Sequence, residues 1–261
     1  RHASRVPIAG TVESIAEITP QTLYDCHKAF YTPANMCLVA VGDLDPASVF
    51  SLAEEVLPKE SGPAIPRDYG RETDLAPLEA EVSCKMEVSM PTFLLGFKCP
   101  PMSGGQEQMR RTLIGELACD VLLGDSSPLY ARLYSQGLIN GTFGYSFDTL
   151  PGVAYAYIGG DSKDPHAVAE EVLREARRLV KDGIDPDYYA RIVRANYGST
   201  LKSLNSFESI AISLVEGQFD GYDPLLFPEM FDSITPQDLL AFIRKNLCRE
   251  HMALSVVYPK E

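Results

Sequence analysis

The residues best suited to hold a metal ion are few in this sequence. It contains four histidines, at positions 2, 27, 166 and 251. A zinc-peptidase helix places two histidines and a glutamate on one face, in the pattern H-x-x-E-H or H-E-x-x-H. Neither pattern occurs, and Glu250-His251 is an isolated pair before an expected strand. We therefore expect no metal site in this chain.

Nucleophiles and phosphate-binding loops are equally scarce. The sequence has no G-x-S-x-G elbow, and Ser126-Ser127 is better explained as a helix cap. The glycine pairs at 104–105 and 159–160 do not extend to a phosphate loop or a dinucleotide motif. Tyr155 and Tyr157 alternate along one strand face, which favours packing or a surface groove over acid catalysis. We expect no catalytic residue, and an enzyme with an unrecognised site stays an open alternative.

Composition excludes some classes of partner. The chain of 261 residues has a net charge of −13, and phosphate binding needs clustered lysine and arginine, so we expect no nucleic acid. No apolar run reaches the length of a membrane span, and no charged-then-apolar leader opens the chain. The six cysteines show no C-x-x-C spacing, which favours reduced thiols and a cytoplasmic location.

One stretch occurs twice. ITPQTL at 18–23 reappears as ITPQDL at 234–239, an offset of 234 − 18 = 216 residues. Met36, Leu38 and Val41 fall at the same offset on Met252, Leu254 and Val257. Threonine followed by proline is typical of a helix start, and both copies continue into a short apolar run rich in strand formers. We interpret this as an internal duplication: a helix from Pro20 to Tyr31 and a strand from Cys37 to Val41, repeated at the end of the chain.

The rest of the pattern predicts an α+β fold, with helices packed on one face of a largely antiparallel sheet. A helix is expected after Asp45-Pro46, and a stretch rich in proline and glycine at 58–80 is typical of a linker. The expected strands are 82–90, 93–97, 141–148 and 153–158, and the expected helices are 106–123, 128–136, one from Asp164-Pro165, 186–204 and 207–215, followed by a loop at 217–228. We divide the chain into a tail of a first unit (1–57), a linker (58–80) and a nearly complete second unit (81–261).

Several segments resemble the pitrilysin/insulinase-type zinc peptidases, family M16, most closely their bacterial processing-peptidase-like branch. The family pattern IT…L…FY-x-P-x-NM…V-x-GD is similar to RVPIAGTVESI (5–15), FYTPANM (30–36) and VGD (41–43). A second pattern, G-x-SS-x-LF…GL, is similar to GDSSPLY (124–130) and GLI (137–139). The resemblance implies the M16 fold, with one complete unit and a fragment of a second.

The family implies two α+β halves around a chamber, with zinc held early in one half by an H-x-x-E-H helix. That helix would precede Arg1, so the resemblance predicts a piece of a longer protein: no cofactor here, and zinc in the missing N-terminal half. Active relatives often supply an arginine and a tyrosine near the GL segment; the matching positions here are Tyr134 and Asn140, with Arg132 as the surrogate arginine.

We expect a non-catalytic half that closes the chamber and helps hold an extended peptide. Its expected partners are an N-terminal catalytic half or an M16-like subunit, and the peptide substrate; a homodimer stays open. The alternative is an inactive scaffold or assembly subunit that pairs with another M16-like chain and never meets substrate.

Overall fold

The computed structural model describes residues 2–58, 65–70 and 72–260. The chain forms two compact units. The first comprises residues 1–70 and 201–224, and the second comprises residues 71–200 and 225–261. Residues 201–224, which our division assigns to the second unit, thus group with the first. Part of the expected linker, at 59–64 and 71, lies outside the described residues.

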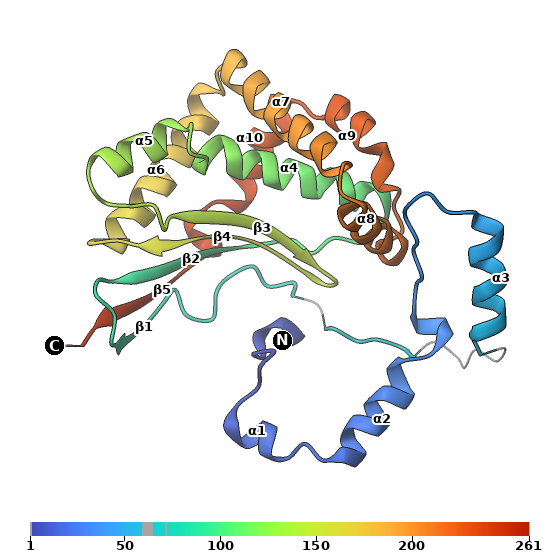
Figure 1. Cartoon of the computed structure of the whole chain (residues 1–261). Helices are drawn as coiled ribbons and strands as arrows, with labels where there is room; N and C mark the ends of the chain where they lie inside the picture. The colour runs from blue at the N-terminus through green and yellow to red at the C-terminus, as the bar shows by residue number, and fades with distance from the viewer. Residues whose placement is uncertain (1, 59–64, 71, 261) are drawn as a thin grey trace. The chain divides into compact units, whose positions relative to one another are not determined.

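The second unit is built on a five-stranded sheet in the order β1-β5-β2-β4-β3 (Figure 1). Its strands are β1 Glu81–Met86, β2 Thr92–Cys99, β3 Gly144–Leu150, β4 Val153–Asp161 and β5 Met252–Pro259. Only β1 and β5 run parallel, so the predicted largely antiparallel sheet is confirmed. Burial alternates along β2, with Phe93, Leu95 and Phe97 buried, as expected for a sheet covered on one face.

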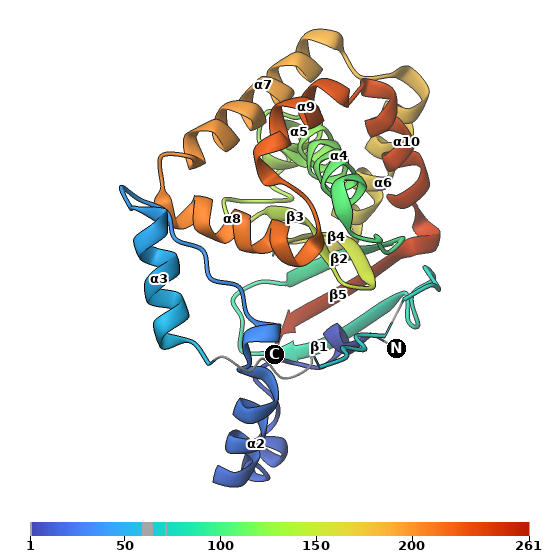
Figure 2. The ribbon, with the colours of Figure 1, turned by 90° about the vertical axis from the view of Figure 1, so that its right-hand side faces the viewer.

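Helices cover that buried face. In the second unit these are α4 Gly105–Leu123, α5 Pro128–Ser135, α6 Pro165–Asp182, most of α7 Pro186–Ser203, α9 Phe227–Ser233 and α10 Pro236–Asn246. Figures 1 and 2 both show α4, α6 and α10 lying over the same side of the sheet. Leu117, Leu122, Val172, Leu239 and Ile243 are fully or almost fully buried between these helices and the strands. The predicted α+β architecture is confirmed.

The first unit contains helices but no strand among its described residues. They are the 3₁₀ turns Ala3–Arg5 and Pro33–Asn35 with α1 Val12–Ala16, α2 Pro20–Phe30, α3 Pro46–Val56 and α8 Phe207–Asp220. The predicted strand at Cys37–Val41 is therefore wrong. A strand needs a hydrogen-bonding neighbour, and no described segment pairs with 36–41.

The predicted loop at 217–228 is also wrong in part. Helix α8 continues through Gly217 and ends at Gly221, whose left-handed conformation (φ 78°) caps it. The 3₁₀ turn Pro224–Leu226 and α9 follow at once. Glycines and prolines here cap and start helices rather than form a loop.

Candidate functional site

The helix and the turn of the duplicated stretch have the same conformation in both copies. Helices α2 and α10 each have 11 residues at the same offset, and Thr19 and Thr235 each form a capping box. The residues that end them, Tyr31 and Leu247, have almost the same backbone angles (φ −91°, ψ 65° and φ −91°, ψ 61°). A 3₁₀ turn follows in both, at Pro33–Asn35 and Arg249–His251. The predicted repeat is therefore confirmed for the helix and the turn, but not for the strand, which only the second copy forms.

The two copies differ in what covers them. Ile234, Leu239 and Leu254 are 6%, 0% and 3% exposed, because α10 packs on α4 and α6 and β5 lies between β1 and β2. Their counterparts Ile18, Leu23 and Leu38 are 51%, 62% and 70% exposed. Burying such a side chain is worth about 1.5–3 kcal/mol. The apolar surface that is buried in the core in the second copy is therefore exposed in the first copy.

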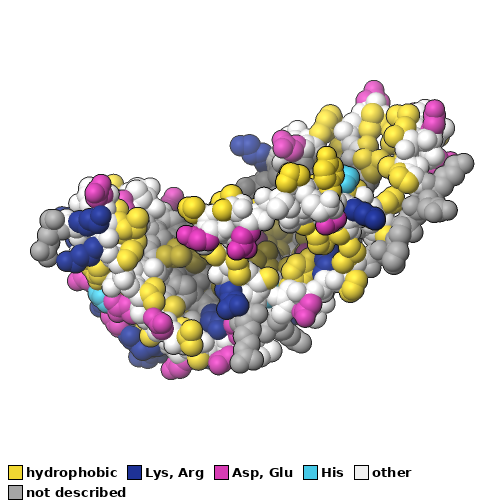
Figure 3. Space-filling model, turned by 90° about the horizontal axis from the view of Figure 1, so that it is seen from below, with side chains coloured by type: hydrophobic (Ala, Val, Ile, Leu, Met, Phe, Trp, Pro, Cys, Tyr) yellow, Lys and Arg dark blue, Asp and Glu magenta, His cyan; other side chains and the backbone are white. Residues whose placement is uncertain are grey.

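This uncovered surface continues onto α3. An apolar recess of about 430 Å³ lies between the extended segment 38–44 and α3, and its walls include Leu38, Leu44, Val49 and Phe50. Hydrophobic side chains crowd the part of the surface where α3 lies, at the right of Figure 3. We call the apolar residues of α2, 36–44 and α3 the unpaired face. Large exposed apolar patches mark interaction surfaces.

The predicted substrate residue Arg132 has protein partners. Its Nε lies 3.3 Å from Glu171 Oε2 and its Nη2 lies 3.0 Å from Glu175 Oε2, both on α6. Burial alone would raise the pKa of Glu175, but hydrogen bonds from Arg178 and Arg132 outweigh it, and the pKa is lowered. Arg132 therefore ties α5 to α6.

Tyr134 lies in the last turn of α5, and Asn140 lies in the loop between α5 and β3. Tyr134 is 56% exposed and stacks on Tyr130, with ring centroids 5.9 Å apart, and Tyr130 meets the edge of Phe143 at 5.8 Å. Asn140 Oδ1 accepts hydrogen bonds from the backbone N–H (2.8 Å) and hydroxyl (2.6 Å) of Thr142 and so closes the turn. We call Tyr134, Tyr130 and Phe143 the aromatic row. The i, i+4 spacing of Tyr130 and Tyr134 on a helix is a sequence signal that could have revealed part of this row.

A polar cluster that sequence reasoning missed joins α4, β3 and α7. Asp120 accepts hydrogen bonds from the Tyr145 hydroxyl (2.8 Å) and Asn196 Nδ2 (2.6 Å). Glu116 lies one turn earlier on α4. Desolvation by the surrounding protein and the charges of Asp120 and Asp148 raise its pKa to about 7, although part of its side chain is exposed. These residues are far apart in sequence, so spacing could not reveal the cluster.

The described residues contain no group of three or more histidines, cysteines or acids that could hold a metal ion. Within them, no helix is both long and apolar enough to span a bilayer.

Comparison with known proteins identifies the family. The model of the peptidase M16 inactive domain matches residues 17–196. The chain is 35% identical over 272 residues to the uncharacterized zinc protease YmfH of Bacillus subtilis, covering 99% of this chain and 61% of that protein. It is 23% identical to the uncharacterized zinc protease SCO5738 of Streptomyces coelicolor, covering 97% of this chain and 56% of that protein.

Solved structures agree on the fold. A putative M16-like peptidase from Alicyclobacillus acidocaldarius superposes with a TM-score of 0.89 at 25% identity, over 100% of this chain and 63% of that one. A peptidase M16 inactive domain from Pseudomonas fluorescens superposes with a TM-score of 0.76 at 20% identity, over 97% and 60%. The chain belongs to the M16 peptidase family, as an inactive domain, and it spans about three fifths of the length of these curated relatives.

Proposed function

We propose that this chain is the non-catalytic part of an M16-type zinc metallopeptidase that closes the chamber and helps hold an extended peptide. The observation that carries the proposal is the contrast between the two copies: the same helix and extended segment are buried in one and uncovered in the other. The partner is a catalytic half or an M16-like subunit whose sheet and helices cover the unpaired face. Zinc belongs to that partner.

The contacts of the second copy indicate how the partner meets the unpaired face. There β5 pairs antiparallel with β2 and parallel with β1, while α10 packs on α4 and α6. By the same geometry, residues 36–41 would form a strand between two partner strands, and Leu23 of α2 would pack under two partner helices. The hydrogen bonds that 36–41 lacks would thereby form.

Two features support peptide holding. Strand β3 stands at one end of the sheet, and an extended peptide can add to such a strand by main-chain hydrogen bonds. Phe143 of the aromatic row immediately precedes β3, so the row borders that strand. Tyr134 and Asn140 are the proposed substrate contacts. Arg132 stays a prediction, since its guanidinium is bonded to α6.

The test is reconstitution. The catalytic half of the same protein, with its H-x-x-E-H helix, is expressed separately and mixed with this chain, and hydrolysis of a fluorogenic peptide is followed with and without a chelator. The proposal predicts that mixing produces chelator-sensitive hydrolysis. Association without any gain in hydrolysis would support the scaffold subunit instead, and neither association nor hydrolysis would contradict both.

A further inference from the structure

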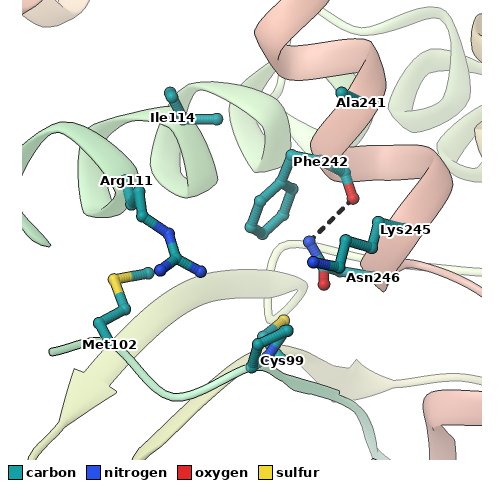
Figure 4. A pocket seen from close by; sticks show the side chains of 9 residues that line it. Cys99, Met102, Arg111, Ile114, Ala241, Phe242, Lys245 and Asn246 are labelled. Atoms are coloured by element: carbon teal, nitrogen blue, oxygen red, sulfur yellow. Dashed lines mark hydrogen bonds between the residues drawn. The ribbon is translucent and has the colours of Figure 1, made fainter. Parts of the chain in front are cut away.

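A second recess, of about 190 Å³, lies in the second unit between the end of β2, the first half of α4 and the last turns of α10. The apolar residues that line it include Met102, Ile114 and Phe242. Two cationic residues, Arg111 and Lys245, also line it. Figure 4 shows these two side chains extending from α4 and α10 toward the same space beneath the Phe242 ring. Nothing in the function proposed above uses this recess.

The two cations have no acidic partner among the residues that the structure describes. The neighbouring Arg110, by contrast, binds Asp238 Oδ2 at 3.1 Å and Ser233. Lys245 lies in the last turn of α10, where the helix dipole alone favours a cation, but Arg111 lies in the second turn of α4, where it does not.

A buried polar group lies at the same place. Asn246, only 4% exposed, lines the recess and donates from Nδ2 to the Phe242 carbonyl at 3.0 Å. Its Oδ1 is buried and has no hydrogen-bond partner in the described part of the chain. A buried acceptor without a donor destabilises a folded protein, and such groups are rare in native structures. The group that this acceptor lacks is an N–H or O–H donor.

We propose that this recess binds the carboxyl-terminal residue of a peptide with an apolar side chain. Arg111 and Lys245 would bind its carboxylate, since charge-assisted hydrogen bonds to carboxylates are the strong ones. The N–H of the same residue would donate to Asn246 Oδ1, and its side chain would pack against Ile114, Phe242 and Met102. Pockets for drug-sized ligands span about 300–1,000 Å³, so this smaller recess suits one residue. The inference does not rest on the proposed function, because Tyr134, Asn140 and strand β3 take no part in lining the recess.

The test is a ligand-observed NMR titration of the full chain with N-acetyl-phenylalanine, up to about 10 mM because small ligands bind in the millimolar range. Its uncharged primary amide and hexanoate, which has a carboxylate but no N–H, are titrated in parallel. We expect N-acetyl-phenylalanine to bind about tenfold or more tightly than either, and its binding to weaken as salt rises. Equal binding of the amide would overturn the carboxylate site, and equal binding of hexanoate would overturn the peptide-terminus assignment.

Matched variants localise the binding. Arg111→Gln and Lys245→Gln should each weaken binding about tenfold, whereas Arg194→Gln on α7 and Lys181→Gln on α6 should leave it unchanged. Circular dichroism confirms that each variant is folded. Absence of binding to the parent chain, or equal loss in all four variants, would contradict the proposal.

Discussion

At the scale of single residues, a mutation can decide whether Arg132 stabilises the fold or binds the substrate. It faces two buried carboxylates on α6, so Arg132→Met leaves Glu171 and Glu175 short of a partner. Breaking a buried ion pair costs about 3–5 kcal/mol, and the partial exposure of Arg132 and the presence of Arg174 and Arg178 reduce this to about 1–3 kcal/mol. Urea unfolding measures the loss.

Tyr134→Ala is the matched comparison on the same helix. Tyr134 is exposed, so its removal should change the free energy of unfolding by no more than about 0.5 kcal/mol. In the reconstituted enzyme it should raise KM for an extended peptide. An Arg132→Met variant of unchanged stability but raised KM would instead make Arg132 a substrate contact.

Glu116 gives a pH prediction. Desolvation by the surrounding protein and the charges of Asp120 and Asp148 raise its pKa in the folded chain from 4.5 to about 7, although the residue is partly exposed. Between these two pH values the folded state therefore binds more protons than the unfolded state. The contribution of Glu116 to stability therefore falls as pH rises from about 4.5 to 7. Glu116→Gln should remove this loss and raise the melting temperature at pH 8 relative to the parent, with little effect at pH 4. A larger gain at pH 4 than at pH 8 would reverse the assignment.

At the scale of elements, each buried residue of the second copy has an exposed counterpart in the first copy that serves as its control in a mutation experiment. Leu239 of α10 is fully buried and its counterpart Leu23 of α2 is mostly exposed. Leu239→Ala should cost about 2–5 kcal/mol, measured by urea unfolding. Leu23→Ala should change the stability of the free chain by less than about 0.5 kcal/mol and should weaken association with the catalytic half. Equal costs in the free chain would mean that the first copy is already covered.

Helix α4 packs against β3 through one glycine. A Cβ on Gly115 would meet Phe147 Cδ1 at 2.3 Å, whereas a Cβ on Gly198 of α7 would meet nothing within 4 Å. Gly115→Ala should destabilise the fold by about 1–3 kcal/mol through overpacking. Gly198→Ala should stabilise it by about 0.5–1 kcal/mol through helix propensity. Thermal unfolding distinguishes them, and stabilisation by both changes would show that α4 and β3 are less closely packed.

Most elements of the second unit could be predicted from sequence, because their signals are local. Thr-Pro and Asp-Pro pairs mark the starts of α10 and α6, and the continuous apolar run at 93–97 marks β2. The segment 37–41 could not be predicted correctly, since its composition favours a strand but only a neighbouring strand can make it one. Of the candidate site residues, the family resemblance placed Tyr134 and Asn140 near the GL segment, yet the sequence could not show that Arg132 is bonded to α6.

At the scale of the whole molecule, the repeat explains why the same set of apolar residues is buried in one copy and exposed in the other. In the second unit, one helix and one strand of the repeat are packed by β1, β2, α4 and α6. In the first unit, the matching helix and the extended segment 36–41 have their apolar residues uncovered. Our account therefore requires a partner with strands and helices of the same kind.

Hydrogen exchange at residues 36–41 tests this requirement most directly, because it reports on the backbone hydrogen bonds that a new strand pairing would create. In the free chain these amides should exchange rapidly, while those of Met252–Val257 are protected. On mixing with the catalytic half, residues 36–41 should become protected to a similar degree as β5. Rapid exchange at 36–41 in a complex that has formed would contradict the account.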